Sequence, residues 1–239
     1  MAGPRILVVE HEESCPPHLV GTWLTEAGCT LEVCRPYAGD PLPDLTSYDG
    51  VLVLGGEMSA HDTTVAWLRP LMVALAAAIT AGTPVLGICL GHQLLAVALG
   101  GEVEPNPRGQ TVGLTPVEWT DAAAHDGWVA GRTGEEVAIH WNNDVVVRLP
   151  DDAVVLARSP GGEVQVARFG PRAWGIQAHP EVDADVVRHW AVTERDEHVS
   201  LGRDPDAVLA AIEEAGPALV AHWKPLTARF AAVAREDRA

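Results

Sequence analysis

Basic residues and long apolar runs are both scarce in this chain of 239 residues. Lysine and arginine together number 16 against 33 aspartates and glutamates, which gives a formal net charge of −17. Such a field repels nucleic acids and anionic lipids, so we expect neither as a partner. No apolar run approaches the roughly 18 residues that a membrane-spanning helix needs. The segment before Ile6 has no signal-peptide pattern either, and we expect a cytoplasmic location.

Cysteine is also scarce, and no pair has the Cys-x-x-Cys spacing. The four cysteines are Cys15, Cys29, Cys34 and Cys89. Their spacing excludes a zinc ribbon and a thioredoxin-type site. The histidines are scattered, without a His-x-x-x-His pair on one helix, so we expect no metal and no cofactor. A Gly-x-x-x-x-Gly-Lys phosphate loop is absent too, and we expect no synthetase domain of that kind in this chain.

Strand and helix patterns alternate over the first hundred residues. Short apolar runs predict strands over 6–10, 30–34, 51–54 and 85–88. Helical patterns end at glycines between them, over 18–28, from Pro70 to Gly82 and over 90–99. This alternation predicts an α/β fold with a doubly wound, mostly parallel sheet and helices on both faces. Ligands of such sheets gather at the carboxyl ends of the strands.

The pattern changes after residue 100. Short strand candidates separated by turn residues predict a mixed or antiparallel extension of the sheet, at 112–117, 136–139, 145–147, 154–157, 164–169 and 174–177. Helical patterns return over 186–192, 207–214 and 218–234, with breaks expected at Asp204-Pro205 and Gly216-Pro217. We expect one domain over 1–239, with a core over 5–182 and a C-terminal helical extension over 183–239 that carries no recognisable motif.

Cys89 stands where a strand is expected to meet a helix. Gly87 and Gly91 flank it, and Gly-x-Cys-x-Gly is the thiol counterpart of the nucleophile elbow, a sharp turn that exposes a strained nucleophile. The first N–H groups of the following helix would favour thiolate over thiol. A lone cysteine is more often a buried core residue, but these neighbours favour a nucleophile.

His179-Pro180-Glu181 follows the last expected strand and supplies a base and a carboxylate. Residues two apart in an extended segment point to the same side, and Pro180 keeps this segment out of a helix. Glu181 can therefore orient the imidazole while its other nitrogen faces Cys89. The pattern predicts a thiol-nucleophile enzyme.

Gly55-Gly56 follows another strand and lets backbone N–H groups approach a ligand. A tight turn is the simpler interpretation of these glycines taken alone. Beside a nucleophile they offer an oxyanion hole, which needs two donors. The N–H groups of Gly56 and of Leu90, the residue after the nucleophile, are the natural pair.

Three motifs carry a family resemblance. They are Val-Leu-Gly-Gly-Glu-Met-Ser at 53–59, Pro-Val-Leu-Gly-Ile-Cys-Leu-Gly-His-Gln-Leu-Leu at 84–95 and Gly-Ile-Gln-Ala-His-Pro-Glu at 175–181. Their order and spacing resemble class I (triad-type) glutamine amidotransferases, above all stand-alone proteins similar to the glutaminase domain of GMP synthase. The resemblance covers roughly residues 5–182 and implies a flavodoxin-like fold.

The resemblance also implies a reaction. Cys89 would attack the side-chain amide of glutamine and form a γ-glutamyl thioester. His179 would protonate departing ammonia and activate water, with Glu181 as its orienter. By the same resemblance Gly56 and Leu90 match oxyanion positions, and the residues implied to hold the substrate are Gly55, Gln93 and Asn142.

Three positions depart from the family pattern. Glu57 stands where proline is common, which places a carboxylate beside the expected oxyanion loop. The segment 140–144 resembles the one that closes over glutamine, but Asn142 replaces the usual residue there. Ala178 also stands where an aromatic residue is frequent, and we expect a more open pocket wall.

Three functions stay open at this point. The first is a glutaminase-type amidotransferase that passes ammonia to an acceptor or to a synthetase partner on another chain. The second is a γ-glutamyl peptide or amine hydrolase with the same three residues. The third is a non-catalytic regulatory module of the same fold, which the departures at Glu57 and Asn142 keep open. The oligomeric state is not indicated by any pattern.

Overall fold

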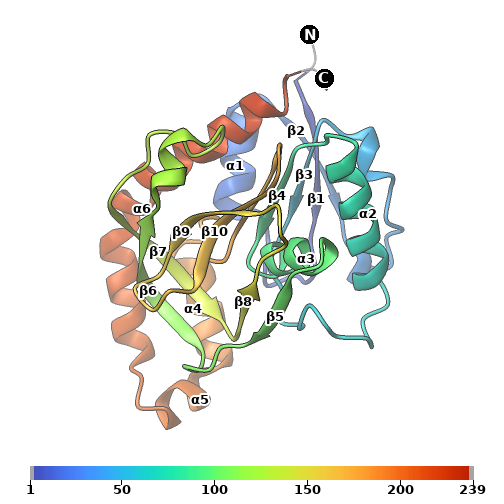
Figure 1. The fold of residues 1–239 in the computed structure, drawn as a ribbon. Helices are drawn as coiled ribbons and strands as arrows, with labels where there is room; N and C mark the ends of the chain where they lie inside the picture. Colours follow the sequence, from blue (N-terminus) through green and yellow to red (C-terminus); the bar gives the residue numbers. More distant parts are fainter. Residues whose placement is uncertain (1–2, 237–239) are drawn as a thin grey trace.

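The computed structural model describes residues 3–236 and places their strands in one large sheet and one small one (Figure 1). The large sheet has nine strands in the order β2-β1-β3-β4-β11-β10-β9-β6-β7, and β5 pairs with β8 in the small one. The strands are β1 (Arg5–Val9), β2 (Thr30–Cys34), β3 (Gly50–Val53), β4 (Val85–Ile88), β5 (Glu102–Pro105), β6 (Thr111–Trp119), β7 (Glu135–Asn142), β8 (Asp144–Arg148), β9 (Val154–Arg158), β10 (Val164–Gly170) and β11 (Ala173–Ile176).

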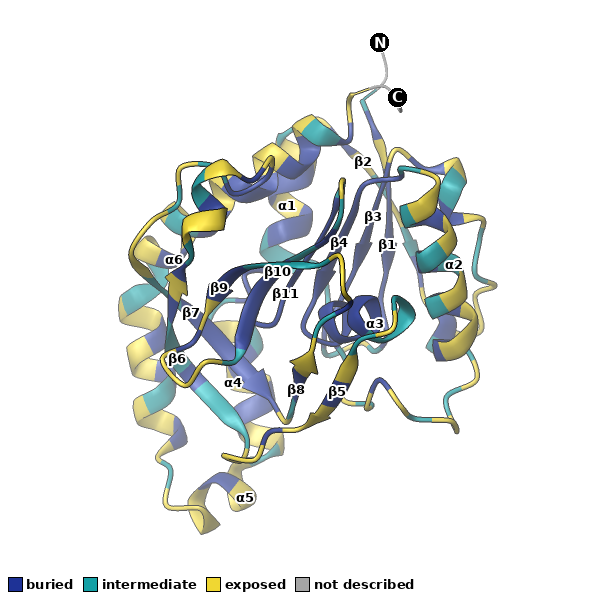
Figure 2. Ribbon diagram, viewed as in Figure 1, coloured by how far each residue is buried: buried dark blue, intermediate teal, exposed yellow. Residues whose placement is uncertain are grey.

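The first half of the large sheet is parallel, as the alternating pattern predicts. β1 pairs in parallel with β2 and β3, β3 with β4, and β4 with β11. Every residue of β3 and β4 is buried, because both faces of these strands are covered (Figure 2). The helices that cover them are α1 (His18–Glu26), α2 (Leu68–Thr80) and α3 (Leu90–Ala98).

Neighbouring residues of β1 point to opposite faces of the large sheet. Ile6 and Val8 of β1 belong to an apolar cluster that includes α1 and the C-terminal helix, whereas Leu7 and Val9 belong to a cluster that includes α2 and α3. This alternation is what a strand between two helical layers requires. The predicted α/β fold, with a mostly parallel sheet and helices on both faces, is therefore confirmed.

The second half of the sheet is antiparallel. β11 pairs in parallel with β4 but antiparallel with β10, and β10, β9, β6 and β7 continue antiparallel. The expected mixed extension is therefore present, but β8 does not join it. β8 instead pairs with β5, a strand that the sequence patterns did not indicate. Single helical turns, which are also absent from the predictions, occur at η1 (Pro36–Ala38), η2 (Leu45–Ser47) and η3 (Asp121–His125).

The C-terminal segment forms α4 (Ala184–Thr193), α5 (Arg195–Ser200) and α6 (Pro205–Val233). The expected break at Asp204-Pro205 is confirmed, since Asp204 caps the amides of Asp206 and Ala207 and Pro205 opens the helix. The expected break at Gly216-Pro217 is wrong, because α6 continues through Pro217.

Packing explains the continuous helix. A proline removes one intrahelical hydrogen bond and strains the preceding turn. On both sides of Pro217, α6 buries large apolar side chains against the core: Leu209, Ile212, Leu219 and Trp223. Their burial offsets the cost of the proline. No helix within residues 3–236 is long and apolar enough to cross a membrane.

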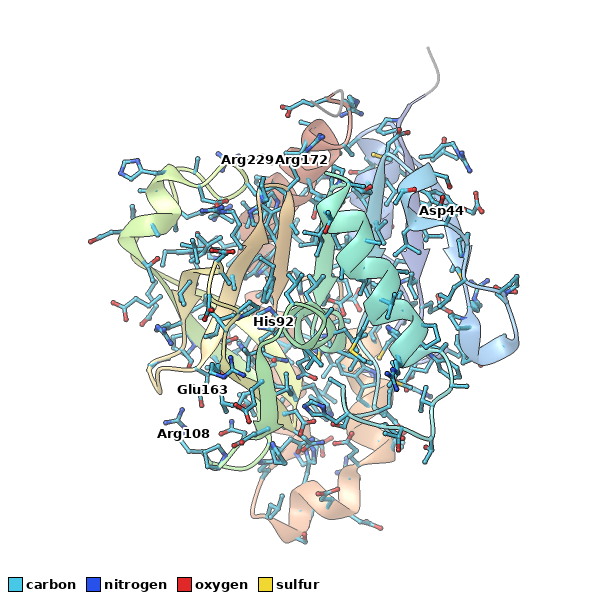
Figure 3. All side chains as sticks on the ribbon, turned by 45° about the vertical axis from the view of Figure 1, so that its right-hand side comes forward. Asp44, His92, Arg108, Glu163, Arg172 and Arg229 are labelled. Atoms are coloured by element: carbon cyan, nitrogen blue, oxygen red, sulfur yellow. The ribbon has the colours of Figure 1, made fainter. Side chains whose placement is uncertain are left out.

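His92 is buried at the centre of the molecule, on α3 (Figure 3). Its ring packs edge-on against Phe169, with 5.3 Å between ring centroids. Gly175 lies so close that a Cβ there would come within 2.5 Å of the imidazole. Burial lowers the pKa of His92 to about 3 and that of His11 to about 4. Both rings are therefore neutral in the folded protein at neutral pH.

These two histidines predict a loss of stability in acid. The unfolded chain protonates a histidine below about pH 6.5, whereas the folded chain keeps His92 neutral down to about pH 3. The free energy of unfolding therefore decreases as the pH is lowered through this window. The decrease is about 1.4 kcal/mol per pH unit for each such histidine. In His92→Gln the slope between pH 6 and pH 4 should be smaller by about that amount, as measured by urea unfolding. An unchanged slope would contradict the assignment of this proton uptake to His92.

Candidate functional site

Cys89 occupies a strained turn between β4 and α3. Its φ is 50° and its ψ is −106°, and its amide donates to the Ile176 carbonyl of β11 at 2.8 Å. A positive φ is costly for a residue with a side chain, and such strain clusters at functional sites. The turn depends on close backbone contacts on both sides: a Cβ on Gly87 would lie 2.6 Å from the backbone of Gly91, and one on Gly91 would lie 2.2 Å from the Val53 carbonyl oxygen.

The segment after β11 carries His179 and Glu181 to the same end of the sheet. His179 Nδ1 and Glu181 Oε1 are 2.7 Å apart, and both side chains are almost fully buried. The backbone holds this segment in place, because the His179 amide donates to the Ile139 carbonyl and the Leu19 amide donates to the Glu181 carbonyl. Glu181 thereby fixes the orientation of the imidazole.

The second nitrogen of His179 is available. Nε2 has no hydrogen-bond partner among the described residues. Burial acts to lower the pKa of His179, but the negative charges of Glu181 and Cys89 prevail and raise it well above the ordinary value. Trp190 shields the ring from solvent, edge-on at 5.0 Å between centroids. The arrangement favours an imidazolium beside the sulfur of Cys89.

The two glycines after β3 lie against the same turn. A Cβ on Gly55 would lie 3.2 Å from His179 Cε1 and 3.6 Å from Cys89 Cβ. A Cβ on Gly56 would lie 3.2 Å from the Leu90 side chain. Leu90 is the first residue of α3, so its amide has no acceptor within the helix. The structure thus brings the predicted oxyanion residues next to Cys89, and their role stays a prediction.

A pocket of about 590 Å³ opens onto Cys89 and His179. Gly56, Gln93 and Asn142, three residues that the sequence assigns to the site, line it. Asn142 is 5% exposed, and its Oδ1 has no hydrogen-bond partner among the described residues. Glu57 lines the same pocket and is exposed, so the residue that departs from the family pattern does face the site.

Gln93 reaches the nucleophile through a residue that the sequence analysis missed. Gln93 Nε2 donates to Gln177 Oε1 at 3.2 Å and to the Asp144 carbonyl at 3.0 Å. Gln177 Nε2 in turn donates to Cys89 Sγ at 3.7 Å. The signal for Gln177 was present, because it belongs to the motif at 175–181 and precedes His179 by two residues.

A second thiol in the pocket differs sharply from Cys89. Cys15 lines the same cavity and donates to Glu12 Oε1 at 3.1 Å. Burial, with the charge of Glu12 next, raises the pKa of the Cys15 thiol far above its usual range. Cys15 therefore stays protonated. Cys89 alone of these two lies at a helix N-terminus.

The C-terminal segment supplies one wall of the pocket, which no sequence motif indicated. Its contributions are Trp190, Thr193, Glu194 and Glu197. Glu194 Oε2 joins α5 to the rest of the site, since it accepts from Trp141 Nε1 at 3.1 Å and from Gln110 Nε2 at 2.9 Å. The ring of His198 stacks on Trp141 at 4.8 Å. Packing against the sheet is thus not the only role of this segment.

His92 follows Cys89 by three residues but does not line the pocket. Its ring packs against Phe169 instead.

Ala178 is fully buried. An aromatic residue is frequent at this position in the family that the motifs resemble. Across residues 3–236, His, Cys, Asp and Glu side chains form no group of three or more that could hold a metal ion.

Comparisons with known proteins agree with this architecture. The sequence profile described as glutamine amidotransferase class-I matches residues 18–189. The chain is 33% identical over 190 residues to YfeJ, a glutamine amidotransferase-like protein of Salmonella typhimurium, across 77% of this chain and 78% of that protein. It is 36% identical over 184 residues to a GMP synthase of Aeropyrum pernix, across 75% of this chain but 33% of the synthase.

The name of a third relative gives a different substrate. It is a γ-glutamyl-L-1-hydroxyisopropylamide hydrolase of a Pseudomonas species, 33% identical over 156 residues, which cover 61% of this chain and 52% of that enzyme. Among solved structures, a glutamine amidotransferase of Methylobacillus flagellatus superposes with a TM-score of 0.87 at 26% identity, over 99% of this chain and 97% of that one.

The close contacts around the turn predict the effect of one added methyl group. In Gly91→Ala the new Cβ would meet the Val53 backbone at 2.2 Å, and neither backbone can move without distorting β3 or α3. We expect a loss of about 3 kcal/mol in the free energy of unfolding, or about 10 °C in the melting temperature.

Gly127→Ala is the matched control. Gly127 is exposed, its φ is not positive, and nothing stands within 4 Å of the Cβ that would be added. This variant should therefore be as stable as the wild type to within about 0.5 kcal/mol. Equal melting temperatures for the two variants would contradict the account of the turn.

Proposed function

The chain belongs to the class-I glutamine amidotransferase family, and we propose that it hydrolyses the side-chain amide of glutamine through Cys89, His179 and Glu181. One observation carries this proposal: His179 is held by Glu181 at 2.7 Å and offers its unpartnered Nε2 beside the strained Cys89. A nucleophile, its base and a third group that orients the base are the arrangement that covalent catalysis requires.

The reaction then proceeds in two halves. The Cys89 thiolate attacks the amide carbon, and the imidazolium of His179 gives its proton to the departing ammonia, which leaves a γ-glutamyl thioester. Neutral His179 next takes a proton from water, the resulting hydroxide attacks the thioester, and glutamate leaves as the thiolate re-forms. Glu181 stabilises the imidazolium in both halves.

We assign the remaining predicted residues to the oxyanion and to the substrate. The Gly56 and Leu90 amides donate to the oxygen of the tetrahedral intermediate, since both lie against the turn of Cys89. Gly55 leaves room for the substrate between His179 and Cys89, because any Cβ there would contact both. Asn142 lines the substrate pocket with Oδ1 unpartnered among the described residues, while Gln93 acts through Gln177.

The fate of the ammonia is a separate proposal. The match to the Aeropyrum pernix GMP synthase covers a third of that enzyme. We propose that the ammonia is either released into solution or passed to a synthetase on another chain. We also propose a reducing, cytoplasmic compartment, because the mechanism needs a free thiolate and all four cysteines are unpaired.

We propose that the core and the C-terminal extension form one domain, since residues of α4 and α5 line the pocket together with residues of the core.

A second candidate function is hydrolysis of other γ-glutamyl amides. The pocket volume of about 590 Å³ lies within the range of roughly 300–1,000 Å³ for sites that take drug-sized ligands. It therefore has room for a group attached to the γ-glutamyl nitrogen. The relative from Pseudomonas, by its name, hydrolyses such a compound. The chemistry of Cys89, His179 and Glu181 is the same for both functions.

The nucleophile predicts the outcome of a glutaminase assay. Purified protein should release ammonia and glutamate from glutamine, and Cys89→Ala should abolish the release. Cys34→Ala is the control, because Cys34 is buried in the cluster on the other face of the sheet and should leave turnover intact. Turnover that survives in Cys89→Ala, or a folded wild type inert toward every γ-glutamyl compound, would sink the proposal and favour a non-catalytic module.

The raised pKa of His179 predicts the effect of Glu181→Gln on the pH profile. The imidazolium persists to high pH because Glu181 and Cys89 outweigh burial. Without the carboxylate charge the pKa of His179 falls, so the basic limb of the kcat/KM profile should move to lower pH. The maximum should also fall by roughly a hundredfold or more. A basic limb at the wild-type pH would show that Glu181 does not act through His179.

A further inference from the structure

We propose that the pocket selects γ-glutamyl amides whose amine part carries a positive charge, such as a γ-glutamyl diamine. This inference rests on the proposed function, because it assumes that Cys89 acts on a γ-glutamyl bond. It concerns the part of the substrate beyond that bond, which glutamine lacks.

The charge of the pocket wall is the first observation. Its lining residues include five acidic side chains and no lysine or arginine: Glu12, Glu57, Asp144, Glu194 and Glu197. They come from segments far apart in the sequence, so the excess of negative charge belongs to the cavity rather than to one acidic run. A cleft lined by charge of one sign concentrates ligands of the other sign.

Among residues 3–236 no lysine or arginine pairs with any of the five carboxylates, and their one ion-pair contact is that of His198 Nε2 with Glu194 Oε2 at 3.2 Å. The charge of Glu12, followed by burial and by the charge of Glu194, raises the pKa of Glu57. Carboxylates that repel one another in this way gain most from a cation placed between them. The carboxylate of Glu12 accepts hydrogen bonds from the Ser14 hydroxyl at 2.6 Å and from the Glu57 amide at 3.1 Å, and both donors are neutral.

An unpartnered acceptor is the second, independent observation. Asn142 is 5% exposed and donates its Nδ2 to the Asp144 carbonyl at 3.1 Å, which leaves Oδ1 free in the pocket lining. A buried acceptor without a donor is costly. An ammonium group supplies three donors and no acceptor, so it satisfies both this oxygen and the carboxylates.

Two aromatic rings complete the surroundings of a cation. Trp141 and Trp190 both line the pocket, with their ring centroids 5.9 Å apart. The indole of Trp141 is fixed by its hydrogen bond to Glu194 at 3.1 Å. Indole faces attract ammonium groups and also pack against the methylene chain that carries one. Carboxylates, a free amide oxygen and aromatic faces are together suited to an alkylammonium.

Three probes of matched length test the proposal: γ-glutamyl-diaminobutane, the neutral γ-glutamylpentylamide and the anionic γ-glutamyl-aminobutyrate. Binding is measured by calorimetry on Cys89→Ala, so that no turnover is needed, and release of glutamate is measured on the wild type. We expect the cationic probe to bind about tenfold more tightly than the neutral one, and the anionic probe to bind most weakly. In 1 M salt, where the screening length falls to about 3 Å, this preference should shrink.

Charge-removing variants locate the effect. Glu57→Gln combined with Glu197→Gln removes two of the five charges and should reduce the preference for the cation severalfold, while binding of the neutral probe stays the same. These two are chosen because Glu194 and Glu12 also hold Trp141 and the Glu57 amide. Glu118→Gln is the matched control, since it removes the same charge from an exposed site on β6 outside the pocket.

The outcomes separate this inference from the function beneath it. Equal or weaker binding of the cationic probe, or a preference that is undiminished in the double variant, overturns the inference even if glutamine is hydrolysed. Failure of the wild type to release glutamate from any compound overturns the proposed function, while the order of binding to Cys89→Ala still decides whether the pocket selects cations.

Discussion

The backbone turn at Cys89 is the constraint on which the site depends. With φ at 50°, the residue leaves β4 and starts α3 within a single step, so that its sulfur stands at the carboxyl end of the sheet. The glycines at 87 and 91 permit the turn because they allow backbone to touch backbone. β3 delivers Gly55 and Gly56 to the same edge, and β11 delivers His179. The strain at one residue is thus sustained by the packing of three neighbouring strands.

Much of the fold and of the candidate site was predictable because both rest on local patterns. The strands at 30–34 and 85–88 coincide with β2 and β4, since short apolar runs between glycine-ended helices admit few other arrangements. Cys89, His179 and Glu181 were identifiable from their flanking residues. Their convergence follows from the rule that parallel strands end at one edge.

The features that sequence patterns missed depend on contacts between distant segments. Nothing local distinguishes Glu194 or Trp190, yet both wall the pocket because α4 and α5 fold back against it. α6 continues through Pro217 because of what its other residues bury, a balance that a proline rule does not include. Gln177 belongs to the same motif as His179 and Glu181, but the expected function gave it no role.

The structure shows where part of the negative charge of the molecule lies. From the sequence alone, a net charge of −17 indicates only a charged surface that keeps the protein in solution. The pocket instead gathers five carboxylates in one lining, onto which the imidazole of His179 also opens. The pKa of that imidazole is raised by Glu181 and Cys89, which are not among the five, so the groups that favour the imidazolium differ from those that would favour a cationic substrate.

The central claim is that Cys89 is the nucleophile which the rest of the site activates. It is tested most directly by treating the protein with a glutamine-like affinity label and locating the adduct by mass spectrometry. The account predicts one adduct per chain, on Cys89, and protection by excess glutamine. An adduct on Cys15 with Cys89 untouched, or an unmodified chain that is fully folded, would contradict it.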